Sequence, residues 1–250
     1  MSRVSTLKLA ACTVVVAIAC AAAVPAGAQG SYSSSSGRST ELTLFNGYYI
    51  ASDLYSVSDI VSGPTDVKVG LSNSYMWGGR LGFNPNERLG VELAYTRVGS
   101  AVTASGDLPR INPLAPASDS DLGRLNGNSY DMNFLFYQDT PNPRAKGFFV
   151  LGFGWTMTSP DIKIPAPSPY AGQNIKSNSL FNWNFGVGAK VDLNEKLALR
   201  LEGRWRVTDT AITTSAGVYC DYWGYCYSYS SDWYDSGELT AGLTYKIPSR

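Results

Sequence analysis

The chain has 250 residues, with 20 Lys and Arg against 20 Asp and Glu, and a formal net charge of zero. Because there is neither a basic surplus nor a basic patch, the composition argues against nucleic acid as a partner. The length allows one barrel or two small domains.

Residues 1–28 have the organisation of a secretory signal peptide. Basic residues precede an apolar run that ends at Pro25, and residues 26–28 form a small-residue cleavage site. Two alternatives stay open. The run could be a membrane-spanning helix, for which it is short, or Cys20 could be acylated as in a lipoprotein. Residues 29–40 are rich in Ser and Gly and predict a flexible spacer.

Beyond the spacer, eight stretches show the period of two that is typical of β-strands. They cover residues 41–51, 75–83, 89–98, 128–138, 147–158, 181–191, 197–208 and 236–247. The first stretch leaves its facing open, because apolar residues fall on both of its faces: Leu42, Leu44, Phe45 and Tyr49. Each stretch has about the length that a tilted strand needs to cross a bilayer.

The connections between these stretches alternate between long loops and short turns. The short turns are residues 84–88, 139–146 and 192–196. No apolar run of membrane-spanning length follows the leader, and a membrane protein without one must be a closed barrel. The sequence therefore predicts an all-β fold over residues 41–250. We expect an eight-stranded antiparallel up-and-down transmembrane β-barrel with short periplasmic turns and long outer loops.

The hairpin over residues 181–208 indicates which face is inside. Aromatic and aliphatic side chains alternate there with glycines and charged residues. A turn at residues 192–196 would place Gly188 opposite Arg200. The same register would place Gly186 opposite Glu202. Long charged side chains opposite glycines suit a narrow lumen, so we expect the apolar face to contact lipid.

The predicted inward faces carry charges of both signs in equal number. These residues are Arg80, Glu92, Asp131, Lys190, Arg200, Glu202, Arg204 and Glu238. A turn at residues 84–88 would place Arg80 directly opposite Glu92. An eight-stranded barrel is just wide enough for side chains to fill it. We therefore predict a lumen charge network that plugs the barrel, and a narrow or gated ion path is the alternative.

This architecture resembles the eight-stranded outer-membrane β-barrel proteins of Gram-negative bacteria and is similar to the membrane domain of outer-membrane protein A. The resemblance covers residues 41–247 and rests on strand number and loop order. It implies a location in the cell outer membrane, with outer-membrane lipid and the barrel-assembly machinery as partners. Such barrels usually end on an aromatic residue, whereas this chain continues five residues past Tyr245.

The chain has no histidine. The barrel enzymes that this architecture resembles, which modify lipid A or cleave proteins, rely on histidine as general base. The sequence also has no metal-binding motif and no phosphate-binding glycine loop. We therefore predict no catalytic residue, no cofactor and no metal site.

The last long loop contains Cys220 and Cys226, the two cysteines that remain after leader removal. In an oxidising compartment this pair predicts a disulfide. Around it lie aromatic residues that could form a binding surface: Tyr219, Tyr222, Trp223, Tyr225 and Tyr227. Alternatively these rings pack on the barrel rim or at the lipid headgroups.

Together these features predict a non-enzymatic outer-membrane protein with a structural or surface-interaction role. A host or cell-surface ligand would bind its outer loops. A small porin-like diffusion channel is the first alternative, and a lipid-modifying barrel enzyme is the second.

Overall fold

The computed structural model describes residues 38–57, 67–105, 120–162, 178–209, 219–220, 226–227 and 233–247. Within these ranges no helix is long and apolar enough to cross a membrane. The predicted leader and residues 29–37 of the spacer lie outside the described residues, as do Tyr222, Trp223 and Tyr225.

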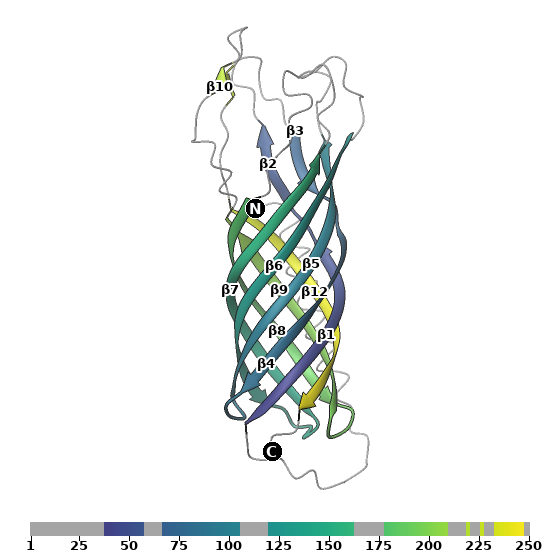
Figure 1. The fold of residues 1–250 in the computed structure, drawn as a ribbon, viewed down its shortest axis with the longest axis vertical. Coiled ribbons are helices and arrows are strands. Elements are labelled where there is room, and N and C mark those ends of the chain that lie inside the picture. The colour runs from purple at the N-terminus through teal and green to yellow at the C-terminus, as the bar shows by residue number, and fades with distance from the viewer. Residues whose placement is uncertain are drawn as a thin grey trace.

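Eight of the strands in the described ranges close into one barrel (Figure 1). They are β1 (Ser39–Ile50), β4 (Ser74–Asn84), β5 (Leu89–Ser105), β6 (Ser120–Asp139), β7 (Ala145–Ile162), β8 (Asn178–Asp192), β9 (Leu197–Thr208) and β12 (Tyr234–Ile247). Every neighbouring pair is antiparallel, and the pairing of β5 with β6 closes the ring. The ring has no free edge, so its backbone groups are paired without water. The predicted fold is confirmed.

Several strands extend beyond the predicted limits. β1 begins at Ser39, inside the predicted spacer, and β12 begins at Tyr234. Residues 99–105 and 120–127 belong to β5 and β6, so the prediction that they form a loop is wrong. In this part the strands carry polar residues on both faces, so the alternation ends while the backbone pairing continues.

Four further strands lie where the sequence predicts long loops. β2 (Asp53–Val57) pairs with β3 (Val67–Leu71), and β3 in turn pairs with the end of β5. β2 and β3 therefore extend the hairpin of β1 and β4 beyond the ring, as Figure 1 shows at the top of the barrel. β10 (Tyr219–Cys220) and β11 (Cys226–Tyr227) form a separate two-stranded sheet.

The three short turns lie at one end of the barrel, which we call the turn end; it is at the bottom of Figure 1. The opposite end is the loop end. An asparagine side chain organises each turn. Asn86 Oδ1 accepts from the backbone N–H groups of Arg88 and Leu89, and Asn194 Oδ1 makes the same pair of bonds to residues 196 and 197. Asn142 Oδ1 accepts from one backbone N–H group, that of residue 144. Asparagine favours turns because its side chain can bind the backbone in this way.

Both predicted hairpin registers are wrong by two residues. Gly188 faces Glu202 and Gly186 faces Arg204. The carbonyl of Leu197 accepts from the N–H groups of residues 193 and 194, and Asp192 pairs with Ala198, so the turn keeps its five residues but lies one position further along the chain, at residues 193–197. A shift of two residues keeps every side chain on its predicted face.

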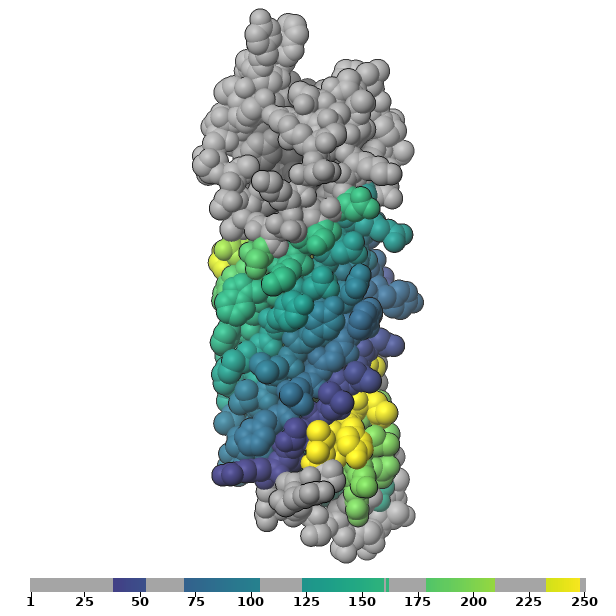
Figure 2. Space-filling view, in the orientation of Figure 1, coloured from purple at the N-terminus to yellow at the C-terminus, as the bar shows by residue number. Residues whose placement is uncertain are grey.

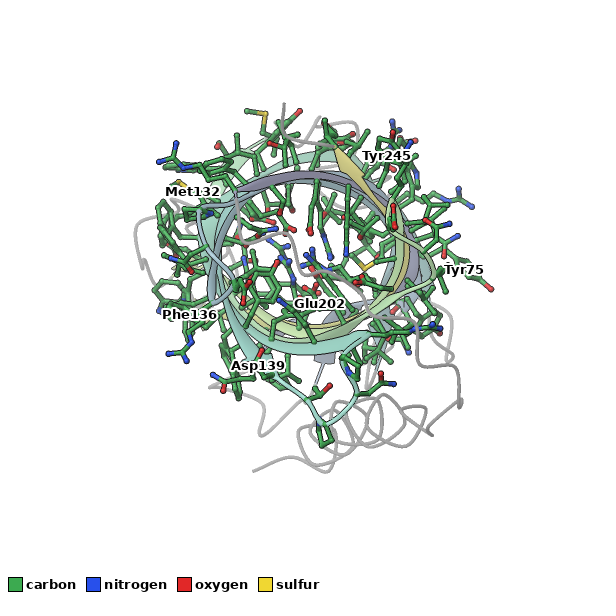
Figure 3. All side chains as sticks on the ribbon, turned by 90° about the horizontal axis from the view of Figure 1, so that it is seen from below. Tyr75, Met132, Phe136, Asp139, Glu202 and Tyr245 are labelled. Carbon is green, nitrogen blue, oxygen red and sulfur yellow. The ribbon has the colours of Figure 1, made fainter. Side chains whose placement is uncertain are left out.

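The two faces of the wall have opposite character. In Figure 3 the side chain of Glu202 lies inside the barrel, whereas Tyr75, Met132, Phe136 and Tyr245 lie outside. The first strand, whose facing the sequence left open, turns Leu42 and Leu44 outward and Phe45 and Tyr49 inward.

Aromatic side chains form part of a belt on the outer face near the loop end, across four of the strands. Tyr95, Tyr130, Trp155 and Phe181 are direct partners across β5, β6, β7 and β8. The rings of Tyr95 and Tyr130 are 5.4 Å apart, and those of Trp155 and Phe181 are 6.1 Å apart. Such belts lie at the interface between hydrocarbon and headgroups in membrane barrels.

Candidate functional site

Ten charged side chains of the described residues are buried, and all lie on inward-facing positions of the strands. The cations are Arg80, Lys190, Arg200, Arg204 and Arg206, and the anions are Glu41, Glu92, Asp131, Glu202 and Glu238. Eight of these residues are the ones that the sequence analysis placed in the lumen. Their numbers balance, and Figure 3 shows polar side chains filling the interior of the ring.

Glu41 and Arg206 are not among the residues that the sequence predicts for this network. Arg206 lies on the same face of β9 as Arg200 and Arg204, because all three are at even-numbered positions of the strand. The alternation was therefore sufficient to place Arg206 in the lumen. Glu41 was missed because the facing of the first strand could not be read from residues that are apolar on both faces.

At mid-height the lumen holds a central cluster, which consists of Arg80, Glu92, Arg200, Glu202 and Arg204. Glu202 Oε2 accepts from Arg80 Nη1 at 2.7 Å and lies 2.6 Å from Arg200 Nη2. Arg204 Nε donates to Glu202 Oε1, and Arg204 Nη2 lies 3.3 Å from Glu92 Oε1. The cluster contains three guanidinium groups and two carboxylates, so its formal surplus is one positive charge.

The predicted direct pair of Arg80 and Glu92 is wrong. Arg80 faces Ala94 across the strands, and Glu92 faces Gly82. Arg80 Nε lies 3.8 Å from Glu92 Oε1, whereas Arg80 Nη1 lies 2.7 Å from Glu202 on the far wall. The strongest partner of Arg80 therefore comes from a strand that is distant in sequence.

Nearer the loop end lies a second group, the loop-end cluster of Arg206, Asp131, Glu238 and Asn182. Arg206 Nη1 and Nη2 donate to the two oxygens of Asp131 at 2.9 and 2.8 Å, a bidentate pair. Arg206 Nε donates to Glu238 Oε1 at 2.6 Å, and Nη1 also donates to Asn182 Oδ1 at 2.8 Å. One cation against two carboxylates gives this cluster a formal surplus of one negative charge.

Near the turn end, the lumen holds a third group, which consists of Lys190, Glu41 and Tyr137. Lys190 Nζ donates to Glu41 Oε2 and, at 2.7 Å, to the hydroxyl of Tyr137. That hydroxyl donates to Asn84 Oδ1 at 3.1 Å. The amide of Asn84 then donates to Ser39 at 3.0 Å, so the network reaches the first residue of β1. It ties the beginning of the barrel to β4, β6 and β8.

Two phenylalanines share the lumen with these charges. The guanidinium carbon of Arg80 lies 4.1 Å from the centre of the Phe45 ring, and that of Arg200 lies 4.7 Å from the Phe148 ring. These are cation–π contacts. Glycine makes the room: a Cβ atom on Gly188 would lie 2.3 Å from the Phe148 ring. This explains why large rings fit inside so narrow a barrel.

At the loop end a cavity of about 70 Å³ lies above the loop-end cluster. Its walls are Ser, Thr, Leu and Val side chains together with Tyr49 and Tyr234, and its floor includes Arg206 and Glu238. An apolar cavity of about 150 Å³ holds benzene, whereas a water molecule occupies about 30 Å³ of liquid. The cavity is therefore of a size for a few water molecules.

The predicted loop site is described only in part. Cys220 and Cys226 are direct partners in the β10–β11 ladder, next to the pair of Tyr219 and Tyr227. Directly opposed residues of antiparallel strands have Cα atoms about 4.5–5.5 Å apart, a separation that a disulfide can span. The disulfide and the aromatic binding surface stay predictions.

Within the described ranges, no group of three or more His, Cys, Asp or Glu side chains is arranged to hold a metal ion. The ten buried charges are arranged as ion pairs in three successive groups along the barrel. What they can do chemically is fill and close the lumen.

The family model of the outer membrane protein beta-barrel domain matches residues 9–246. The chain belongs to this family. It is an outer-membrane β-barrel protein.

Solved structures of other outer-membrane proteins share the fold. The outer membrane protein OprG from Pseudomonas aeruginosa is 12% identical, with a TM-score of 0.56, and the match covers 86% of this chain and 99% of OprG. AlkL, solved in lipid bilayers, is 12% identical with a TM-score of 0.52, over 90% of this chain and 96% of AlkL. Neisserial surface protein A is 14% identical with a TM-score of 0.50, over 84% of this chain and 99% of that protein. No curated protein sequence matches the chain.

Proposed function

We propose that this outer-membrane barrel is non-enzymatic, that ion pairs plug its lumen, and that its outer loops bind a host or cell-surface ligand. The central cluster is the observation that carries the proposal. Its five long side chains extend from β4, β5 and β9 into one level of the lumen, and each is at most 3% exposed. A solute would have to displace them to pass.

The signs of the charges add a second barrier. The loop-end cluster has a formal surplus of one negative charge, which repels anions, and the central cluster has a surplus of one positive charge, which repels cations. The effective dielectric constant is lower inside a protein than in water, so such a charge acts more strongly on an ion. An ion of either sign would therefore meet one repulsive level.

Planar-bilayer recording of the purified protein tests the plug. We expect no stepwise conductance from the wild-type barrel. The double variant Arg80→Ala/Glu202→Ala removes two of the five central side chains and leaves the formal surplus of the cluster unchanged, so it should conduct. The matched control is Glu195→Ala/Lys196→Ala, which removes a pair of the same kind from an exposed turn. Steady conductance from the wild type would favour the diffusion channel instead.

One observation favours that channel as the second candidate. Three buried polar atoms in the lumen have no hydrogen-bond partner in the described part of the chain. They are Arg80 Nε in the central cluster and the side-chain atoms Asn133 Oδ1 and Asn184 Nδ2. Unpaired buried polar atoms are costly, so rearranged ion pairs could have similar energy. The small size of the loop-end cavity opposes a route for anything larger than water.

The absence of histidine supports the non-enzymatic part of the proposal. All five buried carboxylates also have a cation as partner, which favours a structural role over acid–base catalysis. The lipid-modifying enzyme therefore has the least support of the three candidates.

A further inference from the structure

The loop-end cavity combines a charged floor with apolar walls. Arg206 and Glu238 belong to its floor. Four aliphatic side chains, which we call the apolar collar, also line it: Leu71, Val98, Leu125 and Leu180. Val98 is two residues nearer the loop end than Thr96 on β5, and Leu125 is four residues nearer the loop end than Ser129 on β6. The cavity is therefore polar at its floor and apolar towards the loop end.

Glu238 is the less neutralised of the two carboxylates in the loop-end cluster. Both oxygens of Asp131 accept hydrogen bonds from Arg206, whereas in Glu238 only Oε1 accepts one, from Arg206 Nε. Glu238 Oε2 has no hydrogen-bond partner among the described residues, although Glu238 is only 2% exposed. A buried carboxylate oxygen without a partner is costly. The surplus negative charge of the cluster therefore lies at the floor of the cavity and calls for a cation.

The hydroxyl groups of the wall help to select the kind of cation. Ser129 Oγ and Thr156 Oγ1 are 2.8 Å apart, and the hydroxyls of Tyr49 and Tyr234 are 2.5 Å apart, so these groups already bind one another. A hydroxyl oxygen in such a pair can still accept a further hydrogen bond. A calcium ion needs about six to eight oxygen ligands, which a single free carboxylate oxygen and paired hydroxyls do not supply.

A primary ammonium group matches this wall better. It has three N–H donors, as in lysine, and it carries an alkyl chain on its fourth side. Its donors can meet Glu238 Oε2 and hydroxyl oxygens, while the chain contacts the apolar collar. The cavity of about 70 Å³ has the volume of about two water molecules in the liquid, which is room for the ammonium group and the first carbon of the chain.

We propose that the loop-end cavity binds the ammonium group of a small primary alkylamine, with the nitrogen at Glu238 and the alkyl chain along the apolar collar. The central cluster, with its surplus of one positive charge, repels the cation from below and keeps it at this level. On the face shown in Figure 2, the side chains of β4, β5, β6 and β7 form a continuous wall, so this side offers no way in from the lipid. The site is separate from the outer-loop surface and does not depend on whether the barrel conducts.

Ligand-observed NMR of n-propylammonium chloride with the purified full-length protein in detergent measures this binding. A ligand of four non-hydrogen atoms binds with a Kd no tighter than about 0.04 mM, so the titration extends to about 50 mM. Propan-1-ol has the same carbon chain without the charge, and potassium chloride supplies a cation without N–H donors. We expect saturable binding of n-propylammonium, and neither propan-1-ol nor potassium should displace it.

Two variants, each with a matched control, locate the site. Glu238→Gln keeps the shape and removes the charge at the floor, so the affinity should fall about tenfold. Glu41→Gln makes the same change at a buried, ion-paired carboxylate near the turn end and should leave binding unchanged. Val98→Phe fills the collar without changing a charge and should block binding. Val91→Phe makes that change on the outward face of β5 and should not.

Four results would overturn the proposal. They are no saturable binding of n-propylammonium by the wild type, displacement by potassium or propan-1-ol, equal affinity of Glu238→Gln and the wild type, and binding that survives Val98→Phe. Heat resistance of each variant in detergent reports its folding. If Glu238→Gln does not fold, the comparison of Val98→Phe with Val91→Phe still decides whether the amine lies in this cavity. Conductance by the wild type would refute the plug without changing the outcome of this binding test.

Discussion

Glu202 is the residue whose change should most strongly destabilise the barrel. Its carboxylate receives Arg80, Arg200 and Arg204, and its side chain is fully buried. Glu202→Gln keeps the shape but removes the charge. Three guanidinium groups would then face the single carboxylate of Glu92 in the central cluster.

The expected loss follows from burial. Removing one partner of a buried ion pair costs about 3–5 kcal/mol, because the other charge stays behind without compensation. No discount for solvent is needed, since all the groups involved are at most 3% exposed. We therefore expect Glu202→Gln to lower the free energy of unfolding by about 3–5 kcal/mol.

Urea titration of the protein in lipid vesicles, followed by tryptophan fluorescence, measures this free energy by linear extrapolation. Glu195→Gln makes the same chemical change on an exposed turn and should stay within about 0.5 kcal/mol of wild type. A loss below about 1 kcal/mol for Glu202→Gln would mean that water reaches the cluster, and the dry plug would be refuted.

A double-mutant cycle sharpens the test. Arg80→Met in the Glu202→Gln background restores the original surplus of one positive charge, so the second change should cost less than it does alone. Arg80 lies closer to Glu202 than to Glu92, so its coupling to Glu202 should be the larger. Additive losses for Arg80 and Glu202 would show that the two side chains do not interact.

Four further outcomes can be checked. Gly188→Ala should destabilise the barrel by about 1–3 kcal/mol in the same titration, because its Cβ would overlap the Phe148 ring; Phe148→Leu should recover part of the loss. Mass spectrometry of protein isolated without reductant should find Cys220 bonded to Cys226, and free thiols at both positions would contradict the bridge. On a glycan array, Trp223→Ala should lose any binding that the wild type shows while the barrel keeps its heat resistance. Protease added to intact cells should cut the long loops and leave the short turns uncut, whereas cleavage confined to the turns would reverse the proposed orientation.

Sequence alone was sufficient for the barrel and for the side of the wall on which most residues lie. The period of two follows from strand geometry, in which successive side chains point to opposite faces. Phe149, Leu151 and Trp155 therefore had to share one face, and Arg200, Glu202 and Arg204 had to share the other. The order of short turns and long loops gave the strand number and the antiparallel pairing. Each of these features is local in the chain.

Features that depend on contacts between distant strands could not be read in this way. Register depends on the hydrogen bonds inside each turn, and Leu197 became part of its turn because its carbonyl accepts two N–H groups. The polar extensions of β5 and β6 depend on backbone pairing with each other rather than on any hydropathy pattern.

Ion pairing is the clearest case. Arg80 reaches Glu202 across a distance of 122 positions in the sequence, and Lys190 reaches Glu41 across 149. Alternation can place these side chains in the lumen, because facing is a property of one strand. Which carboxylate each cation meets depends on barrel closure, strand stagger and side-chain length together, and only the tertiary structure brings these into one place.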